Sequence, residues 1–335
     1  MVKVNEMANR LKKLLYLSHG KPLTGGYFHE VFFAKSLANY LQIDLEIQRF
    51  EKDFEGLPGH LKLLWKGFCA AKADLVVSVA RLSIPVLFKN AFSTTKIILV
   101  WHYHDENANI SRLLKVWYRL SLSLMRLYPS SRLKVVVVAP FWQSYFEKVI
   151  GKQKIHFYPN LFDHSFYKAY RTVAKKKQVH LGQVSFKNHP DIFWIAAQIT
   201  QLGYACYLST NDKTKLTTQE SMGLSVKYFE SHEGYLKEMA ASLYTLALPN
   251  FNEGWNRVAH ESIMVGTPVI GYPMGGLADL LKTSHSGIAN NKEEVVQMIR
   301  NGSTIGLSID LNLYDISENE KYLEELKKWI IMTKK

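Results

Sequence analysis

The sequence predicts an α/β protein with two doubly wound parallel sheets and a separate helix at its end. Strand-like apolar runs alternate with segments of helical periodicity along the whole chain of 335 residues. One basic and polar stretch, Tyr167–Lys177, interrupts this alternation and is interpreted as a linker. We therefore expect two facing Rossmann-like domains, at residues 1–165 and 166–315, and a C-terminal helix at 316–335 that crosses back.

The first half of the chain contains six apolar runs that are typical of buried strands. They are Lys13–Ser18, Asp44–Phe50, Asp74–Val79, Lys96–His102, Lys134–Ala139 and Ile155–Tyr158. Segments with helical spacing lie between them. These are Tyr27–Leu41, Gly59–Lys72, Ile110–Leu127 and Phe141–Ile150. This order of elements favours a parallel sheet whose connections are helices.

The second half repeats the plan and adds the last helix. Its expected strands are Gln178–Leu181, Ala205–Ser209, Val226–Phe229, Tyr244–Pro249 and Pro268–Gly271. Its expected helices are Asp191–Leu202, Tyr235–Ala241, Trp255–Val265 and Gly275–Leu281. Ser317 and Glu320 have the spacing of a capping box and predict the start of the last helix. Ligands of such sheets bind at the carboxyl ends of the strands.

The charge distribution and the cysteine content indicate which binding partners and which cellular compartment to expect. Residues 1–165 carry 23 Lys and Arg against 12 Asp and Glu, a balance of +11, whereas the remaining 19 against 17 give +2. A basic first half favours an anionic partner, which could be nucleic acid, acidic lipid or an acidic substrate. Two distant cysteines, Cys69 and Cys206, suit a reducing compartment. No apolar run approaches the roughly 18 residues of a membrane-spanning helix, so we expect a cytoplasmic protein.

Two carboxylates eight positions apart, Glu253 and Glu261, stand at the mouth and in the second turn of an expected helix. Gly266-Thr267-Pro268-Val269-Ile270 and the pair Gly275-Gly276 follow them. This arrangement resembles the E-x7-E signature of family-4 retaining glycosyltransferases, which have the two-domain GT-B fold. The resemblance implies that Glu253 contacts hydroxyls of the donor sugar and that Glu261 hydrogen-bonds the nucleotide ribose. The alternative is an acidic first turn with a capping role and one surface glutamate.

The same resemblance implies that residues between the two carboxylates make further contacts with the donor. They are Gly254, Trp255, Asn256 and Val258. The family usually has G-F-G after its first glutamate, so Trp255 keeps an aromatic ring. Asn256 departs from the pattern, because it adds a side chain where the backbone approaches the sugar.

Two further segments resemble the family's phosphate-binding regions. Gly25 and Gly26, before an amphipathic helix, look like its first glycine loop, whose amides face the donor diphosphate. Leu181–His189 resembles the G-R-x(n)-K-N segment, in which an Arg and a Lys neutralise the leaving diphosphate. Lys187 matches the Lys, and its alternative is a solvated loop lysine. Gln183 stands where the Arg is expected, which removes one charge-assisted contact.

A histidine cluster ends the expected strand Lys96–His102. Many relatives have a His-Asp pair here, whose histidine contacts the donor sugar or developing charge. The match favours His104 and Asp105, with His102 as the next candidate. One alternative is an H-x-H-D metal cluster, because His102 and His104 would project to one face of an extended chain. The other is a packing or solvated role for both histidines.

The segment Ile110–Lys134 has six basic residues, no acidic residue and interleaved leucines and aromatics. A basic amphipathic helix of this kind can lie on an anionic membrane. The alternative is a domain helix with a buried apolar stripe and a basic outer face. The first interpretation places the protein peripherally on the inner face of the membrane.

Taken together, the resemblance implies metal-independent, retaining transfer of a sugar from a nucleotide-sugar donor, with no cofactor. The absence of a D-x-D motif from the sequence fits this. The acceptor is expected to be a glycan or a lipid-linked, anionic molecule, and nucleic acid is not expected as a partner. Two alternatives remain open: a nucleotide-sugar epimerase on the same fold, and a catalytically weak protein that binds anionic surfaces or nucleic acid.

Overall fold

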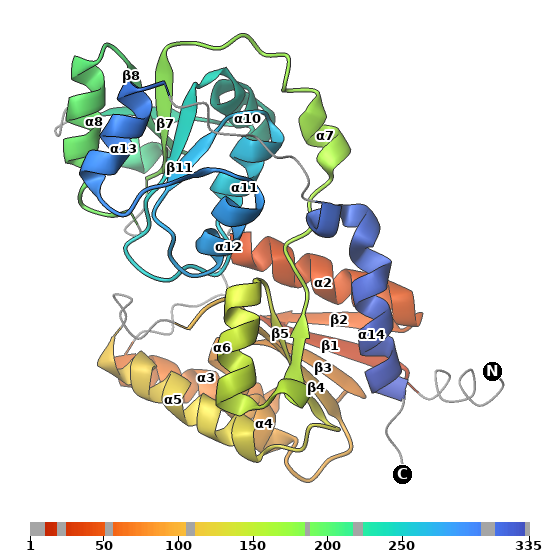
Figure 1. Ribbon diagram of the computed structural model, residues 1–335. Coiled ribbons are helices and arrows are strands. Elements are labelled where there is room, and N and C mark those ends of the chain that lie inside the picture. Colours follow the sequence, from red (N-terminus) through yellow and green to blue (C-terminus); the bar gives the residue numbers. More distant parts are fainter. Residues whose placement is uncertain are drawn as a thin grey trace. The chain divides into compact units, whose positions relative to one another are not determined.

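A computed structural model describes seven stretches of the chain (Figure 1). They are residues 11–18, 25–50, 56–104, 111–184, 188–216, 224–302 and 312–331. The chain divides into two compact units, Met1–Leu161 with Ser317–Lys335, and Phe162–Ile316. The expected linker Tyr167–Lys177 lies inside the second unit, and part of it belongs to a short helix, α7 (His164–Lys168). No helix in the stretches described is long and apolar enough to span a membrane.

The first unit contains a six-stranded parallel sheet in the order β2-β1-β3-β4-β5-β6. The strands are β1 (Lys13–Ser18), β2 (Asp44–Arg49), β3 (Leu75–Val79), β4 (Lys96–Trp101), β5 (Leu133–Val137) and β6 (Ile155–Phe157). Strands β3 and β4 are buried along their whole length, as expected for apolar runs covered on both faces. The strand order reverses between β1 and β3, so the carboxyl ends of these strands border the crevice of a doubly wound sheet.

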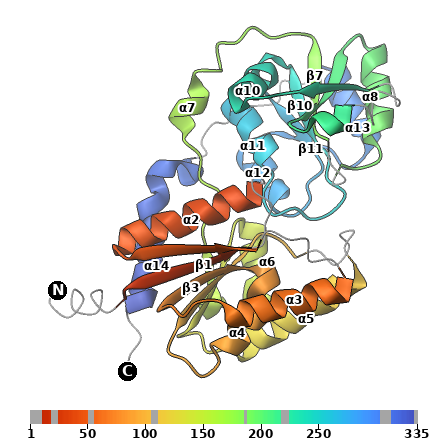
Figure 2. The same ribbon diagram turned by 180° about the vertical axis from the view of Figure 1, so that it is seen from behind.

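Helices cover both faces of this sheet (Figures 1 and 2). Helix α2 (Gly25–Leu41) and the last helix, α14 (Asn319–Ile331), pack against each other. The right-handed crossovers after β2 to β5 put the other four helices on the opposite face. They are α3 (Gly56–Cys69), α4 (Ser83–Lys89), α5 (Arg112–Leu127) and α6 (Pro140–Ile150).

The last helix begins later than the sequence predicts. Ile316–Glu318 form a 3-10 turn, so α14 starts at Asn319 and Ser317 is not its N-terminal residue. The helix is held by side chains of the first unit: Tyr158 donates to Asn319 at 2.6 Å, and Tyr40 donates to Glu324 at 2.6 Å. The C-terminal segment thus completes the first unit, as the predicted crossing back requires.

The second unit has its own six-stranded parallel sheet, in the order β12-β11-β10-β7-β8-β9 (Figure 1). The strands are β7 (Gln178–Gln183), β8 (Ala205–Thr210), β9 (Ser225–Tyr228), β10 (Tyr244–Ala247), β11 (Val269–Gly271) and β12 (Gly287–Ile288). Besides α7, its helices are α8 (Ile192–Gln201), α10 (His232–Ala241), α11 (Arg257–Met264), α12 (Gly276–Thr283) and α13 (Lys292–Arg300). The predicted fold class, two Rossmann-like sheets and a C-terminal helix, is confirmed.

Candidate functional site

Glu253 lies in the loop that follows β10, at the carboxyl edge of the second sheet. Its backbone forms a parallel bridge with Gly275, and Gly276 N–H donates to Glu253 O at 2.9 Å. Gly275 has φ of 61°, and a Cβ atom there would lie 2.4 Å from Glu253 O. Only glycine allows this approach. The bridge holds together the loops that follow β10 and β11.

Asn256 connects Glu253 to helix α11. The helix begins at Arg257 rather than at the predicted Trp255, and Asn256 is its N-cap. Asn256 Oδ1 accepts from Ala259 N–H at 2.8 Å, while Asn256 Nδ2 donates to Glu253 Oε2 at 2.6 Å. The side chain that departs from the family pattern therefore orients the carboxylate. Asn before a periodic apolar segment is a known capping signal, and starting the helix two residues early concealed it.

Trp255 points into the second unit. Its ring stacks on Tyr314 with centroids 4.5 Å apart, and its Nε1–H donates to His260 Nδ1 at 3.1 Å. Burial, together with the charges of His164 and Arg257, holds the pKa of His260 well below its usual range, so the imidazole is neutral and accepts this bond. Any contact of Trp255 with a donor is thus left to its main chain.

Glu261 is only 5% exposed, so it is not a surface glutamate. Its Oε1 lies 3.2 Å from Arg257 Nη2, 3.4 Å from His232 Nε2 and 3.5 Å from the Tyr167 hydroxyl. Burial and then the Glu261 charge raise the pKa of Tyr167, so Tyr167 stays a donor. No residue in the described stretches donates to Oε2, which leaves one carboxylate oxygen for another hydroxyl.

The loop after β7 comes to the same edge of the second sheet. Gln183 is the last residue of β7, its side chain is exposed, and its carbonyl accepts from Asn188 Nδ2 at 2.8 Å. His189 N–H donates to Leu248 O at 2.7 Å, which ties this loop to the loop that carries Glu253. Lys187 lies outside the described residues. Val258 is partly buried in the first turn of α11, and Gly254 is buried.

In the first unit, His102 follows β4 and meets a carboxylate from α2. Its Nε2 lies 2.9 Å from Glu30 Oε1, and the Tyr16 hydroxyl donates to Glu30 Oε2 at 2.7 Å. Because a carboxylate only accepts, His102 Nε2 carries the proton of this bond. Burial and then the Glu30 charge raise the pKa of Tyr16, which therefore remains a donor.

His102 also lies beside the glycine-loop end of α2. A Cβ on Gly26 would come 3.4 Å from His102 Nε2, and Gly25 is the first residue of the helix. Glu30 was missed by sequence reasoning. The available signal was a lone carboxylate within the apolar run Tyr27–Phe33.

His104 has different surroundings from His102. It is 7% exposed and packs among aromatic rings, with Tyr145 stacked on it at 5.8 Å between centroids and Trp101 edge-on at 6.1 Å. Asp105 lies outside the described residues. In the stretches that the structure describes, no three His, Cys, Asp or Glu side chains come together in a way that could hold a metal ion.

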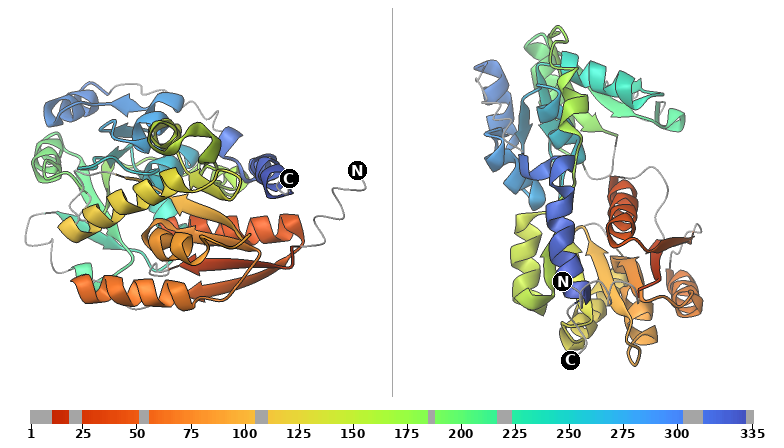
Figure 3. Two further views of the ribbon diagram at one scale, coloured as in Figure 1. Left: turned by 90° about the horizontal axis from the view of Figure 1, so that it is seen from below. Right: turned by 90° about the vertical axis from the view of Figure 1, so that its right-hand side faces the viewer.

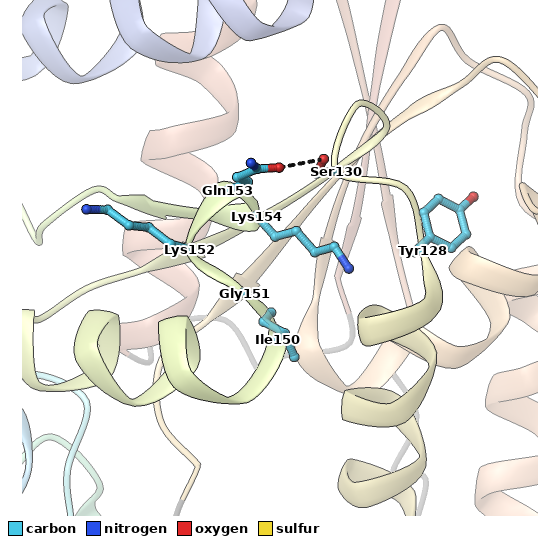
Figure 4. A pocket seen from close by; sticks show the side chains of 7 residues that line it. All are labelled: Tyr128, Ser130, Ile150, Gly151, Lys152, Gln153 and Lys154. Atoms are coloured by element: carbon cyan, nitrogen blue, oxygen red, sulfur yellow. Dashed lines mark hydrogen bonds between the residues drawn. The ribbon is translucent and has the colours of Figure 1, made fainter.

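A hollow in the first unit is lined by none of these residues (Figure 4). Its lining consists of Tyr128, Ser130, Ile150, Gly151, Lys152, Gln153 and Lys154. Lys154 Nζ donates to Met125 O and Arg126 O, both at 2.7 Å, at the C-terminal end of α5. A lysine in this position satisfies terminal carbonyls and opposes the helix dipole, which indicates a structural role.

Comparison with known proteins supports the fold rather than a family. A scan against protein-family profiles finds no match, and neither does a search of curated protein sequences. Among solved structures, HepE from Anabaena in complex with UDP-glucose has a TM-score of 0.68 at 15% identity and covers 94% of this chain and 99% of its own. A glycosyltransferase from Rickettsia africae has a TM-score of 0.67 at 13% identity, covering 96% of this chain and 100% of its own.

An enzyme of another class shares the same architecture. The UDP-GlcNAc 2-epimerase of Methanocaldococcus jannaschii has a TM-score of 0.60 at 10% identity and covers 95% of this chain and 99% of its own. Together with the two six-stranded parallel sheets and the returning C-terminal helix, these similarities show that the chain has the GT-B fold.

Proposed function

We propose that the protein transfers a sugar from a nucleotide-sugar donor to an acceptor hydroxyl, with retention and without a metal ion. The observation that carries this proposal is Glu253, whose carboxylate is oriented by Asn256 and whose backbone is fixed against Gly275 at the carboxyl edge of the second sheet. A carboxylate held in this way is suited to accept hydrogen bonds from sugar hydroxyls. The binding of UDP-glucose by HepE, a protein of the same fold, supports the donor class.

The second unit is suited to bind the donor. The free oxygen of Glu261, Oε2, would accept from a ribose hydroxyl, while Arg257, His232 and Tyr167 hold the carboxylate in place. Helices α11 and α12 begin directly after Asn256 and Gly275, so their N-terminal amides would face the diphosphate. Lys187, by the resemblance of its segment, would add a positive charge.

For the chemical step we propose the same-face substitution that the family resemblance implies. The acceptor oxygen attacks the anomeric carbon on the face from which the diphosphate leaves. One carbon–oxygen bond forms as the other breaks, and the acceptor proton passes to the departing phosphate oxygen. His102, held by Glu30, is the histidine that we assign to this step, ahead of His104 in its aromatic surroundings. Its role would be to donate to developing negative charge.

Nucleotide-sugar epimerisation is the second candidate, favoured by the fold shared with the Methanocaldococcus jannaschii enzyme. A panel of nucleoside diphosphates in a thermal-shift assay tests both candidates, because both require nucleotide binding. Mass spectrometry of donors incubated with and without candidate acceptors then separates them. A protein that no nucleotide stabilises would contradict both.

Replacing Glu261 by alanine is expected to raise the KM for the donor by about tenfold with little change in kcat. A ribose contact is made equally in the ground and transition states, so its loss is a loss of uniform binding. Steady-state kinetics check this, with the melting temperature as a control for the three partners left without their carboxylate. A collapse of kcat at unchanged KM would show that Glu261 acts in the chemical step.

Activity is expected to survive EDTA. The diphosphate would be stabilised by helix N-termini and by Lys187, so removal of divalent ions should leave the initial rate within about twofold. The assay compares rates before and after chelation and after re-addition of magnesium or manganese. Complete loss with EDTA and recovery with a divalent ion would restore the metal-cluster alternative at His102, His104 and Asp105.

A further inference from the structure

Helix α3 exposes a stripe of large apolar side chains. Trp65 is 71% exposed, Leu61 56% and Phe68 43%. Their spacing of four and three residues places them on one face of the helix. Lys62 and Lys66 are exposed beside them, and α3 contains no acidic residue. Exposed apolar side chains of this size that form a stripe mark an interaction site more often than scattered ones do.

Helix α5 has an outer face of the same kind. Its buried side consists of Trp117, Ser121, Leu122 and Met125. Its exposed residues alternate arginine with apolar side chains and are Arg112, Val116, Arg119, Leu120, Ser123, Arg126 and Leu127. The buried stripe expected of a domain helix is therefore present. However, the outer face is not simply basic, because Val116 and Leu120 are exposed between the arginines.

The two helices are neighbours on one side of the sheet (Figures 2 and 3). Both pack on α4, whose first five residues are buried beneath them. A Cβ on Gly67 of α3 would lie 2.6 Å from Pro85 of α4, and Ser83 of α4 donates to Ser121 of α5 at 2.7 Å. The rings of His60 in α3 and Trp117 in α5 meet edge-on at 5.1 Å.

We name the outward surface of these two helices the α3–α5 face. It comprises Leu61, Lys62, Trp65, Lys66 and Phe68 of α3 and Arg112, Val116, Arg119, Leu120, Arg126 and Leu127 of α5. Neither helix contains Asp or Glu. The face thus combines fixed positive charge with exposed apolar and aromatic side chains.

We propose that the α3–α5 face docks on an anionic lipid surface. Lysine and arginine are attracted to acidic headgroups, tryptophan prefers the interface, and leucine and phenylalanine can enter the acyl region. A second copy of this chain is disfavoured as the occupant, because a twofold contact would bring the same positive face against itself. Nucleic acid would satisfy the charges but would not bury Leu61, Leu120 or Val116.

This inference does not depend on the proposed transfer reaction, because vesicle binding is measured without donor or acceptor. The full-length protein is sedimented with vesicles of phosphatidylcholine, and with vesicles in which about a third of the lipid is phosphatidylglycerol. We expect at least about tenfold stronger partitioning onto the anionic vesicles, declining as salt is raised from 50 to about 500 mM. Equal partitioning onto both vesicle types, or recovery in the supernatant with both, would overturn the proposal.

Charge-reversal variants test whether vesicle binding occurs through the α3–α5 face. The variant Lys62→Glu/Arg112→Glu/Arg119→Glu is expected to lose at least about tenfold in partitioning. Its control, Lys237→Glu/Lys282→Glu/Arg300→Glu, makes the same change in net charge at exposed sites of the second unit and should bind as the parent protein does. Equal losses in the two variants would mean that net charge alone drives binding, which contradicts a defined face.

Apolar insertion is tested separately by Trp65→Ala, with Trp194→Ala in α8 as the control, because Trp194 is an exposed tryptophan of the second unit. Trp65→Ala is expected to weaken partitioning several-fold and Trp194→Ala to leave it unchanged. Circular dichroism of each variant confirms that it is folded. Binding to a 30-base-pair DNA duplex is measured in parallel at the same salt concentrations. Duplex binding as strong as vesicle binding, and lost in the same variants, would assign the face to nucleic acid instead.

Discussion

Alanine in place of Glu253 is expected to lower kcat at least about tenfold, and up to about a hundredfold, with the second unit folded. A charge-assisted hydrogen bond contributes about 1.5–3 kcal/mol, and its loss in the transition state appears in the rate. Steady-state transfer assays measure the effect, and the melting temperature reports folding. Glu253 is not a helix cap, since Asn256 holds that position, so its replacement should affect stability little.

Replacement of Asn256 separates capping from orientation. Serine retains an oxygen that can cap Ala259 N–H but has no N–H to donate to Glu253. Asn256→Ser should therefore keep the melting temperature within a few degrees while transfer falls several-fold. Asn256→Asp also keeps the cap and adds like charge beside Glu253, so it should be the less active of the two.

Wild-type transfer by a folded Glu253→Ala variant would remove Glu253 from the site.

The second large effect is expected at the His102–Glu30 pair. His102→Gln should lower kcat by about tenfold to a hundredfold with a smaller change in donor KM, because a hydrogen bond to developing charge strengthens in the transition state. Glu30→Gln should produce part of this loss, since its amide can no longer fix the tautomer and orientation of the imidazole as a carboxylate does.

Comparison with His104 decides between the two histidines. His104→Gln disturbs an aromatic cluster, so its main effect should be a lower melting temperature. If His104→Gln lost more kcat than His102→Gln at the same melting temperature, the histidine that donates to the developing charge would be His104 instead. Glu30→Asp provides a further measure, since a shorter carboxylate that restored activity would identify charge as the essential property of residue 30.

Strands β1, β3 and β4 were predictable because they are buried along almost their whole length. β1 is observed at the predicted Lys13–Ser18, and the runs around β3 and β4 differ from the predicted ones by one residue at an end. Two short elements, α4 and β12, were not predicted from the sequence. α4 has seven residues, five of them buried without a polar side, so it shows no helical period. β12 has only two residues.

Side-chain partners were less predictable than elements, because they depend on contacts between distant parts of the sequence. The E-x7-E spacing located Glu253 and Glu261, but two of the three contacts of Glu261 come from distant helices, α7 and α10. Lys175, which lies in the expected linker Tyr167–Lys177, donates to Ala240 O, Ser242 O and Gly266 O, and burial lowers its pKa to about 8. Glu30 and His102 are 72 positions apart, which no local pattern reveals.

The last helix gives the chain an unusual order of assembly. Lys96 donates to Trp329 O, Trp329 Nε1–H donates to Ser130 O, and Leu323, Leu326 and Ile330 are buried in the first unit. A ribosome therefore completes the second unit, Phe162–Ile316, before it has made the residues that finish the first. During synthesis the first unit must wait with part of one face of its sheet uncovered, so a nascent chain stalled before Ser317 would be a substrate for chaperones or proteases even though most of its residues are present.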